Sequence, residues 1–199
     1  ESSELGALLF ASFSCFWTTL TFMLYSHYGL GAGIAGTFGM VGAAGALVAP
    51  IAGRMSDKHG SRWVVAVGMA LLAGSYLLLW GEELARVSTT LHMIALVVGV
   101  VVLDIGAQMT QVANQTRIFG LVPSARSRLN TVYMTVFFTG GAVGSALATI
   151  AWVRWGWNGV CVLALALIGL AGLRFAIGSP DGSGYHEPPV TIEDRMMEA

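Results

Sequence analysis

The chain has 199 residues, of which 55% are hydrophobic and only 11% are charged, and its formal net charge at pH 7 is −1. A soluble domain carries roughly twice that share of charged residues. The near-neutral charge, without any basic stripe, excludes a nucleic-acid partner, because such partners are held through many phosphate contacts. The composition therefore predicts a protein embedded in a lipid bilayer.

Six apolar stretches follow one another along the chain, each close to the roughly 20 residues that a helix needs to cross the hydrocarbon. They run continuously and do not alternate, so they predict helices and not the strands of a membrane barrel. The fold class is therefore an all-α membrane protein. The predicted spans are 5–26, 34–53, 63–81, 91–115, 129–151 and 159–178. Residues 179–199, rich in proline and glycine, are expected to form a flexible cytoplasmic tail.

Basic residues are distributed unevenly between the two sides of these spans. Eight fall on the side that holds both ends of the segment: Arg54, Lys58, Arg62, Arg117, Arg126, Arg128, Arg174 and Arg195. The other side receives only Arg86 and Arg154. Because positively charged loops stay on the cytoplasmic side, we expect both termini of this segment to be cytoplasmic.

The link between the second and third spans, GRMSDKHGSR, places charged residues between two apolar segments. It resembles the signature loop of the major facilitator superfamily of secondary transporters, whose pattern is G-x-x-x-D-[RK]-x-G-R-[RK]. The matching or neighbouring loop residues are Gly53, Arg54, Asp57, Lys58, Gly60 and Arg62, with Ser61 where arginine is usual. The resemblance implies that Asp57 is a conformational latch against the opposite half of the transporter. The alternative is an ordinary charged loop that obeys the positive-inside rule.

A second block, from Asp104 to Gly159, resembles the tenth to twelfth helices of bacterial drug and sugar efflux facilitators. It comprises DIGAQMTQVANQTRIF, RSRLNTVYM and FFTGGAVGSALATIAWVRWGWNGV. The resemblance covers residues 5–178 and implies the C-terminal six-helix half of such a protein, built from two inverted three-helix repeats. It implies proton-coupled efflux of a small molecule by alternating access across a bacterial-type inner membrane. The expected partners are the substrate, protons, lipid and the N-terminal half missing from this chain.

Two helices carry polar residues at helical spacing. Asp104, Gln108, Gln111 and Gln115 keep to one face of the fourth span, and Ser14, Thr18, Thr21 and Tyr25 repeat the same offsets on the first. We expect both stripes to line the substrate cavity, with Asn130 and Tyr133 at its mouth. For the first span, hydroxyls that merely bond their own helix carbonyls are an equal alternative.

Asp104 is the acidic residue placed deepest in a span. A carboxylate near the bilayer centre costs several kcal/mol unless it is paired, hydrated or protonated. Our hypothesis is that Asp104 takes up and releases a proton, or holds a cationic substrate, as the cavity alternates between faces. The alternative is a structural acid bonded to neighbouring helices.

Small residues recur at short intervals in the second and fifth spans and predict close helix packing. They are Gly36, Gly39, Gly42, Gly45, Gly140, Gly141, Gly144 and Ser145. Static packing and sliding of the two halves explain them equally well.

Enzymatic chemistry and metal binding find no support in the sequence. Its four histidines, His27, His59, His92 and His186, are scattered over different loops, and no nucleophile has a plausible base nearby. We therefore expect neither a cofactor nor a metal. Two alternatives to a facilitator half stay open: a six-helix half-transporter acting as a homodimer, and a non-transport membrane scaffold or assembly subunit.

Overall fold

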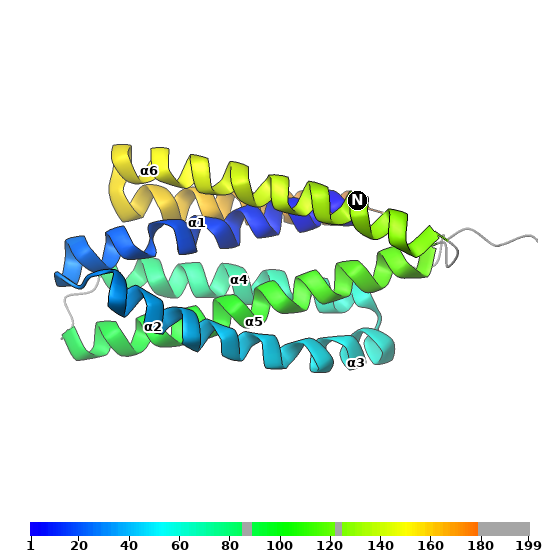
Figure 1. Cartoon of the computed structure of the whole chain (residues 1–199), viewed down its shortest axis with the longest axis horizontal. Coiled ribbons are helices and arrows are strands. Elements are labelled where there is room, and N and C mark those ends of the chain that lie inside the picture. Colours follow the sequence, from blue (N-terminus) through cyan, green and yellow to red (C-terminus); the bar gives the residue numbers. More distant parts are fainter. Residues whose placement is uncertain (85–88, 122–124, 179–199) are drawn as a thin grey trace, which may run out of the picture.

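A computed structural model describes residues 1–84, 89–121 and 125–178, and all its regular elements in these ranges are helices. This confirms the all-α fold class. In chain order the elements are α1 (Ser2–Tyr28), α2 (Ala32–Ala43), the 3₁₀ helix η1 (Ala44–Val48), α3 (Ala49–His59), α4 (Ser61–Leu84), α5 (Thr89–Leu121) and α6 (Arg126–Ile177). They lie along a common direction as an elongated bundle (Figure 1). The expected tail, 179–199, lies outside the described residues.

Four of these helices are long and apolar enough to cross a membrane. The qualifying stretches are Ser2–Tyr28, Ser61–Gly81, Leu91–Gly120 and Arg126–Ile177. The last has 52 residues and, as one straight helix, would extend about 78 Å, more than twice the hydrocarbon thickness. It is interrupted at Gly156, whose φ of 60° and ψ of −149° are not helical. Figure 1 shows α6 turning back on itself, so it consists of two arms.

The predicted span 34–53 is not one continuous helix in the structure. The chain passes from α2 through the five residues of η1 into α3, which continues to His59. Pro50 lies in the first turn of α3, where its missing N–H leaves no helical hydrogen bond unmade. The span was predicted from hydropathy alone, which does not register such a change of helix type.

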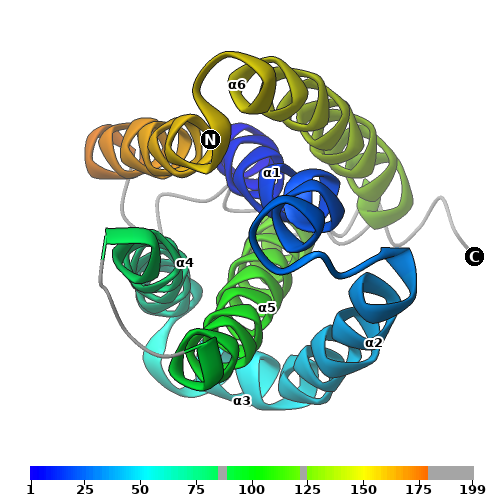
Figure 2. The same cartoon turned by 90° about the vertical axis from the view of Figure 1, so that its left-hand side faces the viewer.

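The first helix, α1, forms the centre of the bundle. Figure 2 shows it between α5 on one side and α6 on the other. Its side chains Leu5, Cys15 and Phe16 are fully buried. The Tyr76 hydroxyl of α4 donates a 2.5 Å hydrogen bond to the Ser12 carbonyl, which ties α4 to this central helix. Such internal partners matter in a membrane, where water does not satisfy buried polar groups.

A glycine-lined crossing joins α1 to the first arm of α6. A Cβ atom added at Gly140 would lie 2.7 Å from Ala7 Cα, and one added at Gly144 would lie 2.6 Å from Ala11 Cα. Beside them the Thr18 hydroxyl donates a 2.8 Å hydrogen bond to Ser145 Oγ. The G-x-x-x-G spacing therefore lets the two backbones touch, as is typical of membrane helix pairs.

Substituting Gly144→Val is expected to destabilise the bundle by about 1–3 kcal/mol, because the side chain meets backbone that cannot move aside. Gly169→Val on the second arm is the matched control, since no heavy atom lies within 4 Å of the added Cβ. The measurement is the thermal unfolding midpoint in detergent micelles. Equal midpoints for the two variants would contradict the close crossing.

Candidate functional site

The charged link between α3 and α4 is mostly helical. Residues from Gly53 to His59 belong to α3, and Gly60 is the single residue between α3 and α4. Gly60 makes the reversal, with a φ of 85° that favours glycine, whereas Gly53 is helical. Asp57 and Lys58 are exposed on the last turn of α3.

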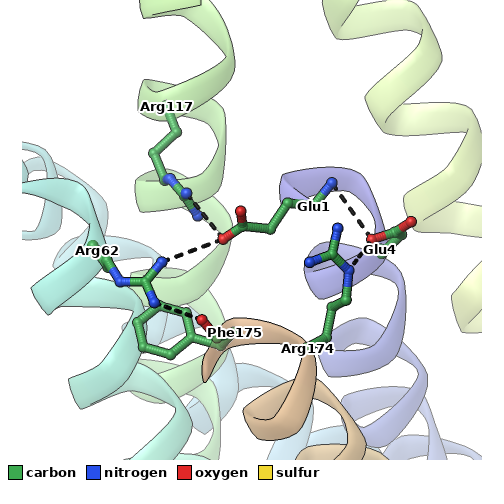
Figure 3. A network of polar contacts seen from close by, with 6 residues as sticks. All are labelled: Glu1, Glu4, Arg62, Arg117, Arg174 and Phe175. Carbon is green, nitrogen blue, oxygen red and sulfur yellow. Dashed lines mark hydrogen bonds and ion pairs between the residues drawn. The ribbon is translucent and has the colours of Figure 1, made fainter. Parts of the chain in front are cut away.

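An ion cluster lies at the end of the bundle where α3 meets α4, and Figure 3 shows its side chains. One carboxylate oxygen of Glu1 lies 3.0 Å from Arg117 Nη2 and 3.5 Å from Arg62 Nη1. Arg62 also donates a 2.5 Å hydrogen bond to the Phe175 carbonyl and stacks 4.1 Å from the centre of its ring. We call Glu1, Arg62 and Arg117 the terminal ion cluster.

A second ion pair stands beside this cluster. Arg174 Nε lies 2.6 Å from a carboxylate oxygen of Glu4. Together the two groups connect the start of α1 and α4 with the ends of α5 and α6. Arg62 was predicted to belong to the signature loop, whereas Glu1, Glu4 and Arg117 were not predicted to form a site. One feature of the sequence could have predicted this cluster: these four residues all lie at the ends of predicted spans, on the same predicted side of the membrane.

A cavity of about 100 Å³ opens in the interior between α1, α5 and α6. Its lining residues are Leu9, Phe10, Phe13, Asp104, Ala107, Gln108, Thr110, Gln111 and Phe137. The structure thus brings together Asp104, Gln108 and Gln111, three of the four residues on the predicted polar face of α5. A cavity between membrane helices with a few convergent polar groups is the usual form of a small-molecule site.

An aromatic wall faces these polar groups. The rings of Phe10 and Phe137 are stacked with centroids 4.0 Å apart, and the Phe13 ring lies 5.9 Å from that of Phe10. Trp17 extends this series along α1, with its centroid 6.1 Å from Phe13. Aromatic faces carry partial negative charge and attract cations, while they also bind apolar groups.

Asp104 is only 6% exposed, and its Oδ2 atom is closed off from solvent without a hydrogen-bond partner. Among the lining residues that the structure describes, none is a lysine or an arginine. A buried carboxylate without a cationic neighbour is stable only when it gains a proton, a ligand or a donor. The cavity therefore contains a carboxyl group with one oxygen that lacks a hydrogen-bond partner.

The remaining residues predicted for the cavity are not among those that line it. Ser14, Thr21, Gln115 and Asn130 are half-buried, whereas Tyr25 is 71% exposed. Tyr133 is buried, and its hydroxyl packs where a side chain at Gly6 would lie. Thr18 is engaged in the hydrogen bond to Ser145. In the part of the chain that the structure describes, no group of three or more His, Cys, Asp or Glu side chains could hold a metal ion.

Comparisons with known proteins show the family to which the chain belongs. The family model described as Major Facilitator Superfamily matches residues 5–192. The chain is 42% identical over 170 residues to the uncharacterized transporter YgaY of Escherichia coli O157:H7, and 36% identical over 173 residues to the "Probable transporter SCO4007" of Streptomyces coelicolor. Both alignments cover 85% of this chain but only 41% and 38% of the respective relatives. The chain thus spans about two fifths of the length of these relatives. Because the family match extends over nearly all of its residues, the chain belongs to the major facilitator superfamily.

Proposed function

We propose that this chain forms one half of a secondary transporter that moves a small molecule across a bacterial inner membrane by alternating access. The observation that carries the proposal is the cavity in which Asp104, Gln108 and Gln111 face an aromatic wall inside a bundle of apolar helices. Membership of the superfamily and the transporter names of both relatives support the transport function. Transport of this kind is not an enzymatic reaction, because the substrate is bound and released by conformational change without being altered chemically.

Proton coupling is the second part of the proposal. Asp104 would bind a proton when the cavity faces one side and release it when the cavity faces the other. Its burial supports this role, because a buried carboxylate without a cationic partner is stabilised when it takes up a proton. We further propose that the direction of transport is export, because the sequence resembles that of efflux proteins.

The architecture proposed for the whole protein has two halves, of which this chain is the C-terminal one. Six spans would form two inverted repeats, with both termini of the segment in the cytoplasm. In that arrangement α1 and α5 are equivalent helices, and both contribute to the cavity. Asp57, exposed at the end of α3, would contact the missing N-terminal half.

Transport is tested by reconstituting the native polypeptide in lipid vesicles with an imposed pH gradient. The probes are tetraphenylphosphonium, a lipophilic cation, and radiolabelled lactose, a neutral sugar. We expect at least one probe to accumulate in vesicles with an acidic interior, and a protonophore to abolish the accumulation. If neither accumulates and the protein instead co-purifies with another membrane protein, the scaffold alternative is favoured. Transport by a polypeptide of this length alone would favour the homodimeric half-transporter.

A further inference from the structure

Three segments meet at the Asp104 side chain. A Cβ atom added at Gly42 of α2 would lie 2.8 Å from Asp104 Oδ2 and 2.8 Å from Cζ2 of Trp17. One added at Gly45 of η1 would lie 2.7 Å from Asp104 Cβ. The carboxyl group and the indole ring therefore border the same point in space, which a methyl group at residue 42 would fill.

The two side chains present complementary polar atoms at this junction. Trp17 Nε1 is closed off from solvent and has no hydrogen-bond partner, and the same holds for Asp104 Oδ2. The indole nitrogen only donates hydrogen bonds, and an ionised carboxylate oxygen only accepts them. Nε1 is separated from Cζ2 by a single ring atom, and the other ring atom near this point is Cη2, which lies 3.1 Å from the added Cβ. A rotation of the ring therefore has to bring the indole nitrogen to the carboxyl group.

Leaving both atoms unpaired is unfavourable, because a buried donor or acceptor loses its hydration without compensation. The loss is larger for a carboxylate than for a neutral group. A conformation in which the two atoms meet removes both penalties at once. A change of a side-chain torsion, or a small shift of the helices, that brings Trp17 Nε1 to Asp104 Oδ2 therefore lowers the free energy.

We propose that the Trp17 indole N–H is the hydrogen-bond donor for Asp104 Oδ2, and that Trp17 is a positioning residue for this carboxyl group. Asp104 lines the cavity together with residues of α1, and it borders Gly42 of α2 and Gly45 of η1. The contact thereby connects the state of the cavity to the packing of α2 against α5. This inference rests on the proposed role of Asp104 in transport, but the pairing itself is measurable without any transport.

The two glycines have different parts in this arrangement. The Cβ added at Gly45 meets not only Asp104 Cβ but also its backbone carbonyl carbon at 3.3 Å, so no rotamer of Asp104 relieves the contact. Gly45 thus sets how closely η1 approaches α5. Gly42 keeps open the space in which donor and acceptor meet. Both lie in or beside a 3₁₀ segment, whose weaker hydrogen-bond geometry makes it the place where this helical stretch deforms most easily.

The test is infrared difference spectroscopy on the native polypeptide in lipid. The carboxyl C=O band of protonated Asp104 is identified as the band that Asp104→Asn removes. We expect Trp17→Phe to shift this band to higher frequency, because a C=O bond that loses a hydrogen-bond donor becomes stiffer. Trp155→Phe, which removes an indole that is 64% exposed, should leave the band in place. Gly42→Ala should shift it, whereas Gly36→Ala, with no heavy atom near the added Cβ, should not.

The reciprocal measurement uses the indole N–H stretch that Trp17→Phe removes, which we expect to shift in Asp104→Asn. If Trp17→Phe does not fold, a benzothienyl analogue of tryptophan at residue 17 keeps the ring shape and replaces the N–H by sulfur. Unchanged positions for both bands would overturn the pairing. A spectrum in which Asp104→Asn removes no carboxyl band would overturn the proton role of Asp104, and the indole band would then decide the pairing by itself.

Discussion

Asp104→Asn is expected to lower proton-driven transport by at least about 100-fold, the scale on which the loss of a positioned proton-transfer group acts. Asparagine keeps the shape of the side chain but does not release a proton. The substitution should leave folding intact, because it places a neutral amide where a carboxyl group without a cationic neighbour now lies. The measurement is the initial rate of accumulation of the transported probe in vesicles with an imposed pH gradient.

Three measurements make this prediction specific. Exchange of the probe between the two sides without a gradient should persist in Asp104→Asn, because binding and rocking do not require net proton movement. Asp104→Glu should restore part of the coupled rate, since it retains an ionisable group in the same cavity. Full coupled transport by Asp104→Asn would refute the proton role. Loss of the folded protein, or of its assembly with another membrane protein, would favour the structural or scaffold alternative.

The sequence alone predicted the helical class because length and hydropathy are sufficient for it. A stretch of about 20 apolar residues has few stable structures in lipid other than a helix. The polar face of α5 was also predictable, because an acid and two amides at helical spacing have a fixed angular relation. The cavity accordingly collects Asp104, Gln108 and Gln111 on one wall.

Other features depend on tertiary contacts that no local pattern specifies. The aromatic wall combines Phe10 and Phe13 of α1 with Phe137 of α6, residues far apart in the chain. Hydropathy identifies each as apolar but does not say which rings meet. The glycine spacing in the predicted span 34–53 predicted close packing, yet the structure gives only two of these glycines a close neighbour. Gly42 and Gly45 face Asp104, while Gly36 and Gly39 have no heavy atom within 4 Å of an added Cβ.

The terminal ion cluster was missed because pairing between separate helix ends is not visible in a linear sequence. Its two arginines were interpreted individually, as contributions to the positive-inside bias. Glu1 directly precedes α1, while Arg62 and Arg117 belong to α4 and α5, so the three meet only when these helices pack. The same two arginines thus support the predicted orientation by their charge and connect helix ends through their contacts.

The second large effect is expected for Glu1→Gln, which removes the carboxylate shared by Arg62 and Arg117. The three side chains are only 17%, 25% and 12% exposed, so solvent screens their interaction weakly. Because the guanidinium groups would lose charge-assisted hydrogen bonds, we expect a loss of about 1–3 kcal/mol in stability. The measurement is the thermal unfolding midpoint in micelles, at low and high salt.

Glu4→Gln is the matched control for this prediction. Glu4 also pairs with an arginine, at 2.6 Å, but its side chain is 58% exposed. An exposed pair of this kind contributes between about 0 and 1 kcal/mol, and salt reduces it further. A much larger loss for Glu1→Gln would show that the shared, half-buried carboxylate holds the helix ends together. Equal losses for the two variants would mean that the terminal ion cluster is no stronger than a surface pair.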